Sequence, residues 1–177
     1  MNQEYWRGKN VLVTGINGFI GGNLTKMLIE NGANVFGLIR NIDKQTFLYF
    51  EGLSEKIVLI MGDLVDKTLM EKIISEENIN VVYHLGAQVE VGLALQNPYL
   101  TFETNIRGTY TLLEAIRRHS DGVESIVIAS SDKAYGAYDI NKMPYKEDYP
   151  LIPKYPYDTS KACADLIAKS YSTNRFC

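Results

Sequence analysis

Short apolar runs recur along the chain and alternate with longer segments in which apolar residues follow a helical spacing. The runs are Val11–Val13, Val35–Ile39, Ile57–Met61, Val81–Leu85 and Ile126–Ala129. Nearly continuous apolar character is typical of strands buried on both faces of a parallel sheet. The runs therefore predict the strands of such a sheet.

The segments between the runs carry apolar stripes that predict helices. The stripes consist of Phe19, Leu24, Met27 and Leu28; of Leu69, Ile73 and Ile74; of Ile106, Tyr110, Leu113 and Ile116; and, after Asp158, of Ala162, Leu166, Ile167 and Ala168. Alternation of strands and helices is typical of right-handed βαβ units. We therefore predict an α/β fold with a doubly wound parallel sheet, formed as one domain by residues 1–177.

Residues 135–156 interrupt this alternation. Four of the five prolines lie here, together with many tyrosines and charged residues. Proline blocks long helices and central strands, so the segment is predicted to be an ordered surface loop. A loop of this length inside a compact domain is more often functional than idle.

Composition narrows the class of protein. The 177 residues are 46% apolar and 22% charged, which excludes a disordered or collagen-like chain. Lys and Arg number 18 against 21 Asp and Glu, a net charge of −3, which argues against a nucleic-acid partner. The two cysteines, Cys163 and Cys177, form no disulfide framework. Without a secretory signal or a run long enough to span a bilayer, we expect a soluble, cytoplasmic protein with no membrane contact.

Three glycines, Gly15, Gly18 and Gly21, follow the first predicted strand and open the first predicted helix. Glycine permits a tight turn and lets the backbone approach a pyrophosphate, whose charge suits the amides at a helix N-terminus. The spacing G-x-x-G-x-x-G differs from the dehydrogenase pattern G-x-G-x-x-G, and glycines also serve turns and close packing. The position between a strand and a helix nevertheless predicts a dinucleotide site.

Residues after the second and third predicted strands bear on the choice of dinucleotide. An acidic residue after the second strand favours a free ribose 2′-hydroxyl, whereas Arg accommodates a 2′-phosphate. Arg40 stands there, with Asp43 further on, which favours NADP without excluding NAD; alternatively, Arg40 is a solvated charge at a helix start. Asp63 follows the third strand, where its carboxylate could accept from an adenine amino group or act as a helix N-cap or turn residue.

Tyr157 and Lys161 lie four residues apart at the start of the last predicted helix, so their side chains share one face. Tyrosine is a poor base at neutral pH, and a nearby cation favours its phenolate form. The pair is therefore a candidate base for oxidising an alcohol while hydride passes to a nicotinamide. Ser131, after the fifth predicted strand, could bond the same hydroxyl. The alternatives are two surface residues and a serine in a turn.

The histidines and cysteines predict no metal site because they are dispersed along the chain. His84, inside a predicted strand, is interpreted as a packed, hydrogen-bonded side chain. His119 would be a charge favourable to a helix C-terminus, and Cys163 a small buried apolar residue.

Together these residues resemble the extended short-chain dehydrogenase/reductases that modify nucleotide sugars. The motifs that carry the resemblance are Thr14-Gly15-x-x-Gly18-Phe19-Ile20-Gly21, Asp63-Leu64, His84-Leu85-Gly86-Ala87, Asn105, Ser130-Ser131 and Tyr157-x-x-x-Lys161. The resemblance implies a Rossmann fold that binds NAD or NADP. The implied cofactor contacts are Gly15, Asn17, Gly18, Phe19, Ile20, Gly21, Arg40, Asp63, Leu64, Leu85, Ala87, Tyr157 and Lys161.

Within that family, Ser131-Asp132-Lys133 resembles the nucleotide-sugar 4,6-dehydratases, and the Lys form is similar to the CDP-glucose type. By contrast, residues 37–40 are closer to the NADP-using GDP-mannose type, so the nucleotide and cofactor stay open. The resemblance implies that Tyr157, Lys161 and Ser131 oxidise C4 of an NDP-hexose. Lys133 would then take the C5 proton while Asp132 protonates the departing C6 hydroxyl.

A 4-epimerase is the alternative enzyme, because it needs no Asp132–Lys133 couple, and these two residues would then be a solvated ion pair. Members of the family also continue well beyond this length, with further strands and a substrate domain. We therefore expect either an N-terminal portion of a longer fold or a natural short product, with an open sheet edge. A homodimer through a four-helix bundle, built from residues 98–119 and 157–174, is also implied. A dinucleotide-binding module without turnover is the non-enzyme alternative.

Overall fold

Five parallel strands form one sheet in the computed structural model, which describes residues 3–119 and 122–174. In spatial order they are β3 (Val58–Met61), β2 (Asn34–Ile39), β1 (Asn10–Thr14), β4 (Val81–His84) and β5 (Ser125–Ile128). Val11 of β1 lies opposite Val35 on one side and Val81 on the other. The strand order reverses direction at β1, so the prediction of a doubly wound parallel sheet is confirmed.

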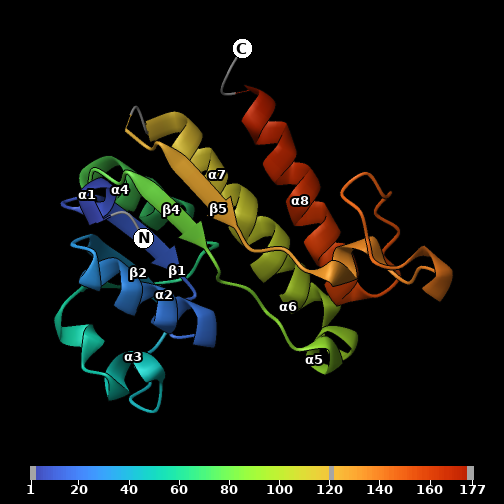
Figure 1. Cartoon of the computed structure of the whole chain (residues 1–177), viewed down its shortest axis with the longest axis horizontal. Helices are drawn as coiled ribbons and strands as arrows, with labels where there is room; N and C mark the ends of the chain where they lie inside the picture. Colours follow the sequence, from blue (N-terminus) through green and yellow to red (C-terminus); the bar gives the residue numbers. More distant parts are fainter. Residues whose placement is uncertain (1–2, 120–121, 175–177) are drawn as a thin grey trace.

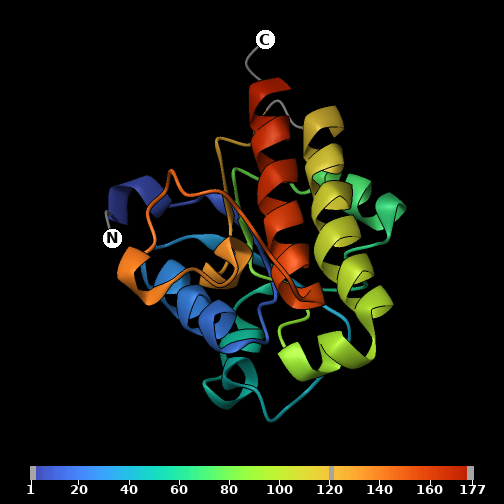
Figure 2. The same ribbon diagram turned by 90° about the vertical axis from the view of Figure 1, so that its right-hand side faces the viewer.

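Helices cover both faces of this sheet (Figure 1). They are α1 (Gln3–Trp6), α2 (Phe19–Glu30), α3 (Phe47–Phe50), α4 (Lys67–Glu76), α5 (Val91–Gln96), α6 (Pro98–Phe102), α7 (Gly108–His119) and α8 (Pro156–Asn174), with a π-helical turn η2 (Glu103–Arg107) and short 3₁₀ turns η1 (Leu53–Glu55), η3 (Asp132–Tyr135) and η4 (Ile140–Lys142). Helices α7 and α8 run side by side (Figure 2). None of the described helices is long and apolar enough to cross a membrane.

Two hydrophobic cores lie on opposite faces of the sheet because successive strand residues point to opposite sides. Leu12 joins the core beneath α4 and α7, whereas Val11 and Val13 join the core beneath α2 and α3. The expectation of strands buried on both faces is correct for β1 and β2. It is wrong for β3 and β5, where Val58 and Val127 are exposed, because within the described residues each of these strands pairs on one side only.

The predicted apolar stripe on α2 matches only part of the face that packs on the sheet. Leu28 is buried and Leu24 packs against the core, whereas Phe19 is 84% exposed and Met27 is also exposed. The rest of the packing face consists of Gly21, Gly22 and Thr25. Small residues let the helix backbone approach the sheet closely, and hydrophobic spacing alone does not reveal such a face. Tyr110 and Leu166 are likewise exposed on α7 and α8.

The ordered surface loop predicted over residues 135–156 is confirmed. Gly136 and Ile152 form a single parallel bridge across it, and the rings of Tyr135 and Tyr145 stack with centroids 4.9 Å apart. The Tyr138 hydroxyl donates to the Pro150 carbonyl at 2.7 Å. These contacts within the loop hold it in one conformation without long helices or central strands.

Candidate functional site

The turn between β1 and α2 depends on close backbone contacts. Gly15 has a φ of +69°, which side chains of L-residues rarely adopt, and a Cβ placed on it would lie 2.7 Å from the Gly86 nitrogen. A Cβ on Gly21 would lie 2.3 Å from the Gly15 carbonyl oxygen. The two glycines are therefore required by the shape of this turn.

The N-terminus of α2 is open to a ligand. Its N-cap residue, Gly18, makes no side-chain hydrogen bond to the first turn. The next two side chains, Phe19 and Ile20, are exposed. Because first-turn amides lack acceptors within the helix and carry partial positive charge, this end of α2 can bind an anion such as a pyrophosphate.

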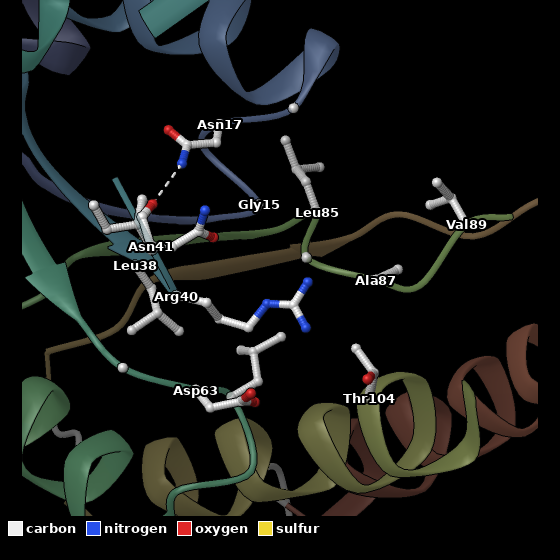
Figure 3. A pocket seen from close by; sticks show the side chains of 15 residues that line it. Gly15, Asn17, Leu38, Arg40, Asn41, Asp63, Leu85, Ala87, Val89 and Thr104 are labelled. Carbon is white, nitrogen blue, oxygen red and sulfur yellow. Dashed lines mark hydrogen bonds between the residues drawn. The ribbon is translucent and has the colours of Figure 1, made fainter. Parts of the chain in front are cut away.

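A cleft of about 280 Å³ opens beside this turn, over the carboxyl ends of the strands (Figure 3). The structure brings eight of the residues expected to contact a cofactor into its wall: Gly15, Asn17, Gly18, Arg40, Asp63, Leu64, Leu85 and Ala87. Phe19, Ile20 and Gly21 lie at the adjoining start of α2. Tyr157 and Lys161 are not among the lining residues.

Arg40 and Asp63 reach the cleft from the ends of β2 and β3. The Arg40 guanidinium projects into the middle of the cleft (Figure 3), and no ion pair holds it among the described residues. The Asp63 carboxylate accepts from the Val65 amide at 3.2 Å, as a turn residue does. The N-cap of α4 is instead Asp66, which accepts from the Leu69 amide at 3.0 Å. Asp63 is therefore a turn residue and not the N-cap of α4.

Asn17 lines the cleft, and its side-chain amide is turned toward Asn41 (Figure 3). Its amide nitrogen donates to the Asn41 carbonyl at 3.4 Å, while its Oδ1 is buried and has no partner among the described residues. Buried polar atoms normally have a partner. The glycine turn and the open helix end together fit a nucleotide ligand, whereas this oxygen is covered by protein atoms.

Tyr157 and Lys161 lie in the first turns of α8 and are 9% and 7% exposed. The Lys161 Nζ donates to the Ala129 carbonyl, 2.8 Å away, just beyond the end of β5. Burial lowers the pKa of Lys161, and the carboxylate of Asp165 opposes that shift. This bond holds the start of α8 at the carboxyl edge of the sheet, the same edge at which the glycine turn lies.

Ser131 is the N-cap of η3, which begins with Asp132 and Lys133 and packs against α8. The Ser131 hydroxyl accepts from the Lys133 amide at 3.2 Å and donates to the Asp132 carboxylate at 3.1 Å. Ser131 therefore caps its own turn, and within the described part of the chain no hydrogen bond joins it to Tyr157. Asp132 and Lys133 are exposed, and no ion pair between them is found there.

A buried polar network lies beneath the cleft. His84 is packed and hydrogen-bonded as predicted, between the hydroxyls of Thr14 at 2.8 Å and Thr109 at 2.9 Å. Burial, aided by the charge of Lys161, lowers its pKa to about 4. The sequence reasoning missed Thr109 and Ser160, which belong to the same network. Polar residues on otherwise buried helix faces are the signal that could have found them.

The predictions for His119 and for the two cysteines have different outcomes. The His119 Nε2 lies 3.8 Å from the Glu71 carboxylate at the end of α7. Cys163 is half-buried, so the expectation of a buried residue is only partly met, and Cys177 lies outside the described residues. Among the described residues, no group of histidine, cysteine or acidic side chains could hold a metal ion.

Comparison with known proteins reveals clear relatives. The sequence profile of the family described as GDP-mannose 4,6 dehydratase matches residues 12–175. The CDP-glucose 4,6-dehydratase of Salmonella typhimurium is 32% identical over 177 residues, which cover 99% of this chain and 49% of that protein. The chain spans about half the length of the curated relatives it matches.

Two solved structures show the same fold. The UDP-glucose 4-epimerase of Thermus thermophilus, solved with NAD, is 32% identical with a TM-score of 0.82, and the match covers 94% of this chain and 51% of that one. The dTDP-glucose 4,6-dehydratase of Streptomyces venezuelae, also solved with NAD, is 28% identical with a TM-score of 0.81, over 93% and 52% of the two chains.

Proposed function

Because this chain belongs to the GDP-mannose 4,6 dehydratase family, we propose that it holds NAD or NADP in the cleft beside the β1–α2 turn and acts with it on a nucleotide sugar. The observation that carries the proposal is the bond from Lys161 to the Ala129 carbonyl, because it holds α8 at the edge of the sheet where the cleft opens. The NAD bound in two solved relatives supports the choice of cofactor.

The residues of the cleft suit a dinucleotide. The turn at Gly15 and Gly18 and the first amides of α2, from Phe19 to Gly21, would receive the pyrophosphate. Arg40 and Asp63 would face the adenosine, and Leu85 and Ala87 would line the path toward the nicotinamide. When bound, the dinucleotide would accept a hydride from a sugar carbon and later return it. The guanidinium of Arg40 favours the 2′-phosphate of NADP.

We propose that Tyr157 removes the proton of the C4 hydroxyl during oxidation. Lys161 lies four residues further along α8 and is buried together with Tyr157, which suits it to assist the tyrosine. Ser131 would hold the sugar hydroxyl, for which its side chain must exchange its present bond to Asp132 for one to the substrate. These three residues serve either a dehydratase or a 4-epimerase.

Asp132 and Lys133 support the dehydratase over the epimerase. The 4-ketone formed by oxidation acidifies the C5 hydrogen, which Lys133 would remove as a proton. Asp132 would protonate the C6 hydroxyl, which leaves as water with its bonding electrons. A hydride then adds to C6 and a proton to C5, giving a 4-keto-6-deoxy sugar and one water. Both side chains are exposed on η3, against α8, and are free to meet a substrate.

A product assay on the purified chain tests this function. The chain is incubated with CDP-glucose or GDP-mannose, each with NAD⁺ or NADP⁺, and products are separated and weighed by mass spectrometry. A 4-keto-6-deoxy product, lighter than the substrate by one water, is expected. A C4 epimer of unchanged mass would identify an epimerase, and dinucleotide binding without product a module without turnover.

The variant Asp132→Asn separates the two enzyme classes. It keeps the shape of the side chain but cannot donate the acidic proton, so dehydration should fall by about 10²-fold or more. Unchanged dehydration in Asp132→Asn would remove this residue from the proposed role.

A further inference from the structure

His84, at the end of β4, lies in the middle of a buried hydrogen-bond chain that none of the steps above uses. Its ring is 3% exposed and lies between the hydroxyls of Thr14 and Thr109. The Thr14 hydroxyl also accepts from the amide of Gly86 at 3.0 Å, and Gly86 lines the cleft. The chain therefore runs from the wall of the cleft, through the ring, to α7.

The direction of each bond follows from the groups at the two ends. A carbonyl oxygen only accepts, so the Thr109 hydroxyl donates its one hydrogen to the Asn105 carbonyl, 2.6 Å away. Thr109 must then accept from His84, which places the ring hydrogen on Nε2. At the other end, Thr14 accepts from the Gly86 amide and has its own hydrogen free for Nδ1. A neutral ring with hydrogen on Nε2 uses every donor and acceptor.

The chain ends on Asn105, which joins two segments of the site. Asn105 is 2% exposed and lies in the π-helical turn η2. Its Oδ1 accepts from the Gln88 amide at 2.7 Å, and its Nδ2 donates to the Gln88 carbonyl and to the Ser160 hydroxyl, both at 2.9 Å. Ser160 donates in turn to the Tyr157 carbonyl at 2.7 Å. One side chain thus bonds both the loop after β4 and the first turn of α8.

We propose that His84 is a positioning residue that, through Thr109 and Asn105, fixes the loop after β4 and the start of α8 relative to each other. A buried polar network whose members are all satisfied is rigid, because any displacement leaves a buried group without its partner. The inference rests on the proposed function, since these two segments carry the proposed dinucleotide contacts and Tyr157. π-Helical turns are also frequent at functional sites.

Nitrogen NMR of the chain carrying ¹⁵N-labelled histidine tests the assigned direction without any ligand. We expect His84 at pH 7 to be neutral with its hydrogen on Nε2, and the exposed His119 serves as an internal reference. A hydrogen on Nδ1 or a charged ring would overturn the assignment. This result does not depend on whether the chain binds a dinucleotide, so its failure is distinct from failure of the proposed function.

The positioning role is tested by Thr109→Val, which removes the hydroxyl and keeps the shape. Hydrogen exchange in the ligand-free chain is measured at the Gln88 amide and at residues 159–161. Both sites should exchange about tenfold faster, because buried partners lose their bonds. Thr111→Val is the matched control, since Thr111 is a second buried threonine of α7 outside the network. Thr109→Ser should restore slow exchange.

Unchanged exchange at both sites in a folded Thr109→Val chain would overturn the positioning role, as would equal effects in Thr111→Val. If Thr109→Val does not fold, Ser160→Ala tests the same link from α8. It removes one acceptor from Asn105 and should speed exchange at the Gln88 amide as well as in α8. A change confined to α8 would contradict the link.

Discussion

At several positions of the site, close contacts between backbone atoms or buried hydrogen bonds determine which residue type fits. Gly15 and Gly21 are needed because backbone atoms occupy the space of a side chain. His84, on β4, is fixed by one partner on β1 and one on α7. The places of Gly15, Gly18 and Asp63 after their strands predicted residues that line the cleft, and the family resemblance implied Leu85 and Ala87. Tyr157 and Lys161 were expected there too but do not line it.

The role of Ser131 could not be predicted in the same way. Its hydroxyl bonds the Asp132 carboxylate and the Lys133 amide of its own turn, which depends on local backbone angles. Ser160 was missed because its partner, Asn105, lies 55 residues away along the chain. Buried polar pairs of this kind arise from the packing of distant elements.

Replacing Gly15 by alanine should lower the free energy of unfolding by about 2 kcal/mol or more, because the new Cβ meets the Gly86 backbone and the positive φ is strained. Urea unfolding measures the change. Gly92→Ala is the control, since a Cβ there has nothing within 4 Å, and a shift below about 1 kcal/mol is expected. Equal effects in the two variants would contradict the tight turn.

His84 predicts a loss of stability in weak acid. Its pKa is about 4 in the folded chain, against an ordinary value of 6.5, because burial disfavours the charged ring. Between these pH values the unfolded chain binds the extra proton, so the free energy of unfolding falls as the pH drops from 6.5 to 4, by up to about 3 kcal/mol. Urea unfolding at a series of pH values measures this slope.

Two controls accompany the pH measurement. His119→Gln alters the exposed histidine and should keep the slope. Glu114, whose pKa is lowered to about 2 mainly by a hydrogen bond from Arg117, stabilises the fold fully above its ordinary 4.5 and loses this contribution as the pH falls from 4.5 to about 2. Its window therefore meets that of His84 only between pH 4.5 and 4. A stability that is flat between pH 6.5 and 4.5 would contradict a neutral buried ring.

At the scale of elements, the alternation of apolar runs predicted every strand to within one residue of its observed ends. The packing face of α2 was predictable only in part from the same pattern: Leu24 and Leu28 belong to it, but glycine and threonine form the rest while Phe19 is exposed. The exposure of the edge strands was not predictable either. The sequence of β5 is as apolar as that of β1, and β5 is half exposed because it lies at the edge of the described sheet.

Two aspartates between β3 and α4, Asp63 and Asp66, should separate ligand binding from helix capping. Asp66→Ala removes the N-cap bond to Leu69 and should cost about 1 kcal/mol of stability with dinucleotide affinity unchanged. Asp63→Ala removes a carboxylate that lines the cleft and should weaken dinucleotide binding about tenfold. Calorimetric titration and urea unfolding of both variants measure this. A loss of dinucleotide affinity in Asp66→Ala together with a loss of stability alone in Asp63→Ala would contradict both assignments.

At the scale of the whole molecule, helices α7 and α8 lie side by side (Figure 2). Each carries exposed apolar side chains, among them Tyr110 on α7 and Leu166 on α8. We propose that these helices form the four-helix bundle of a homodimer. Leu166→Glu should then shift the chain from dimer to monomer in analytical ultracentrifugation, because it places a charge in an apolar interface. Ile140→Glu, on the exposed turn η4, should leave the dimer intact. A monomeric wild-type chain would refute the proposal.

The central claim is that the cleft beside the β1–α2 turn holds NAD or NADP. Calorimetric titration of the purified chain with NAD⁺ and with NADP⁺ tests it most directly, with Gly21→Ala as the variant whose Cβ would meet the Gly15 carbonyl. We expect saturable binding at one site, lost in Gly21→Ala, and Arg40→Ala should weaken NADP⁺ more than NAD⁺. A folded wild-type chain that binds neither, or a Gly21→Ala chain that binds equally well, would contradict the claim.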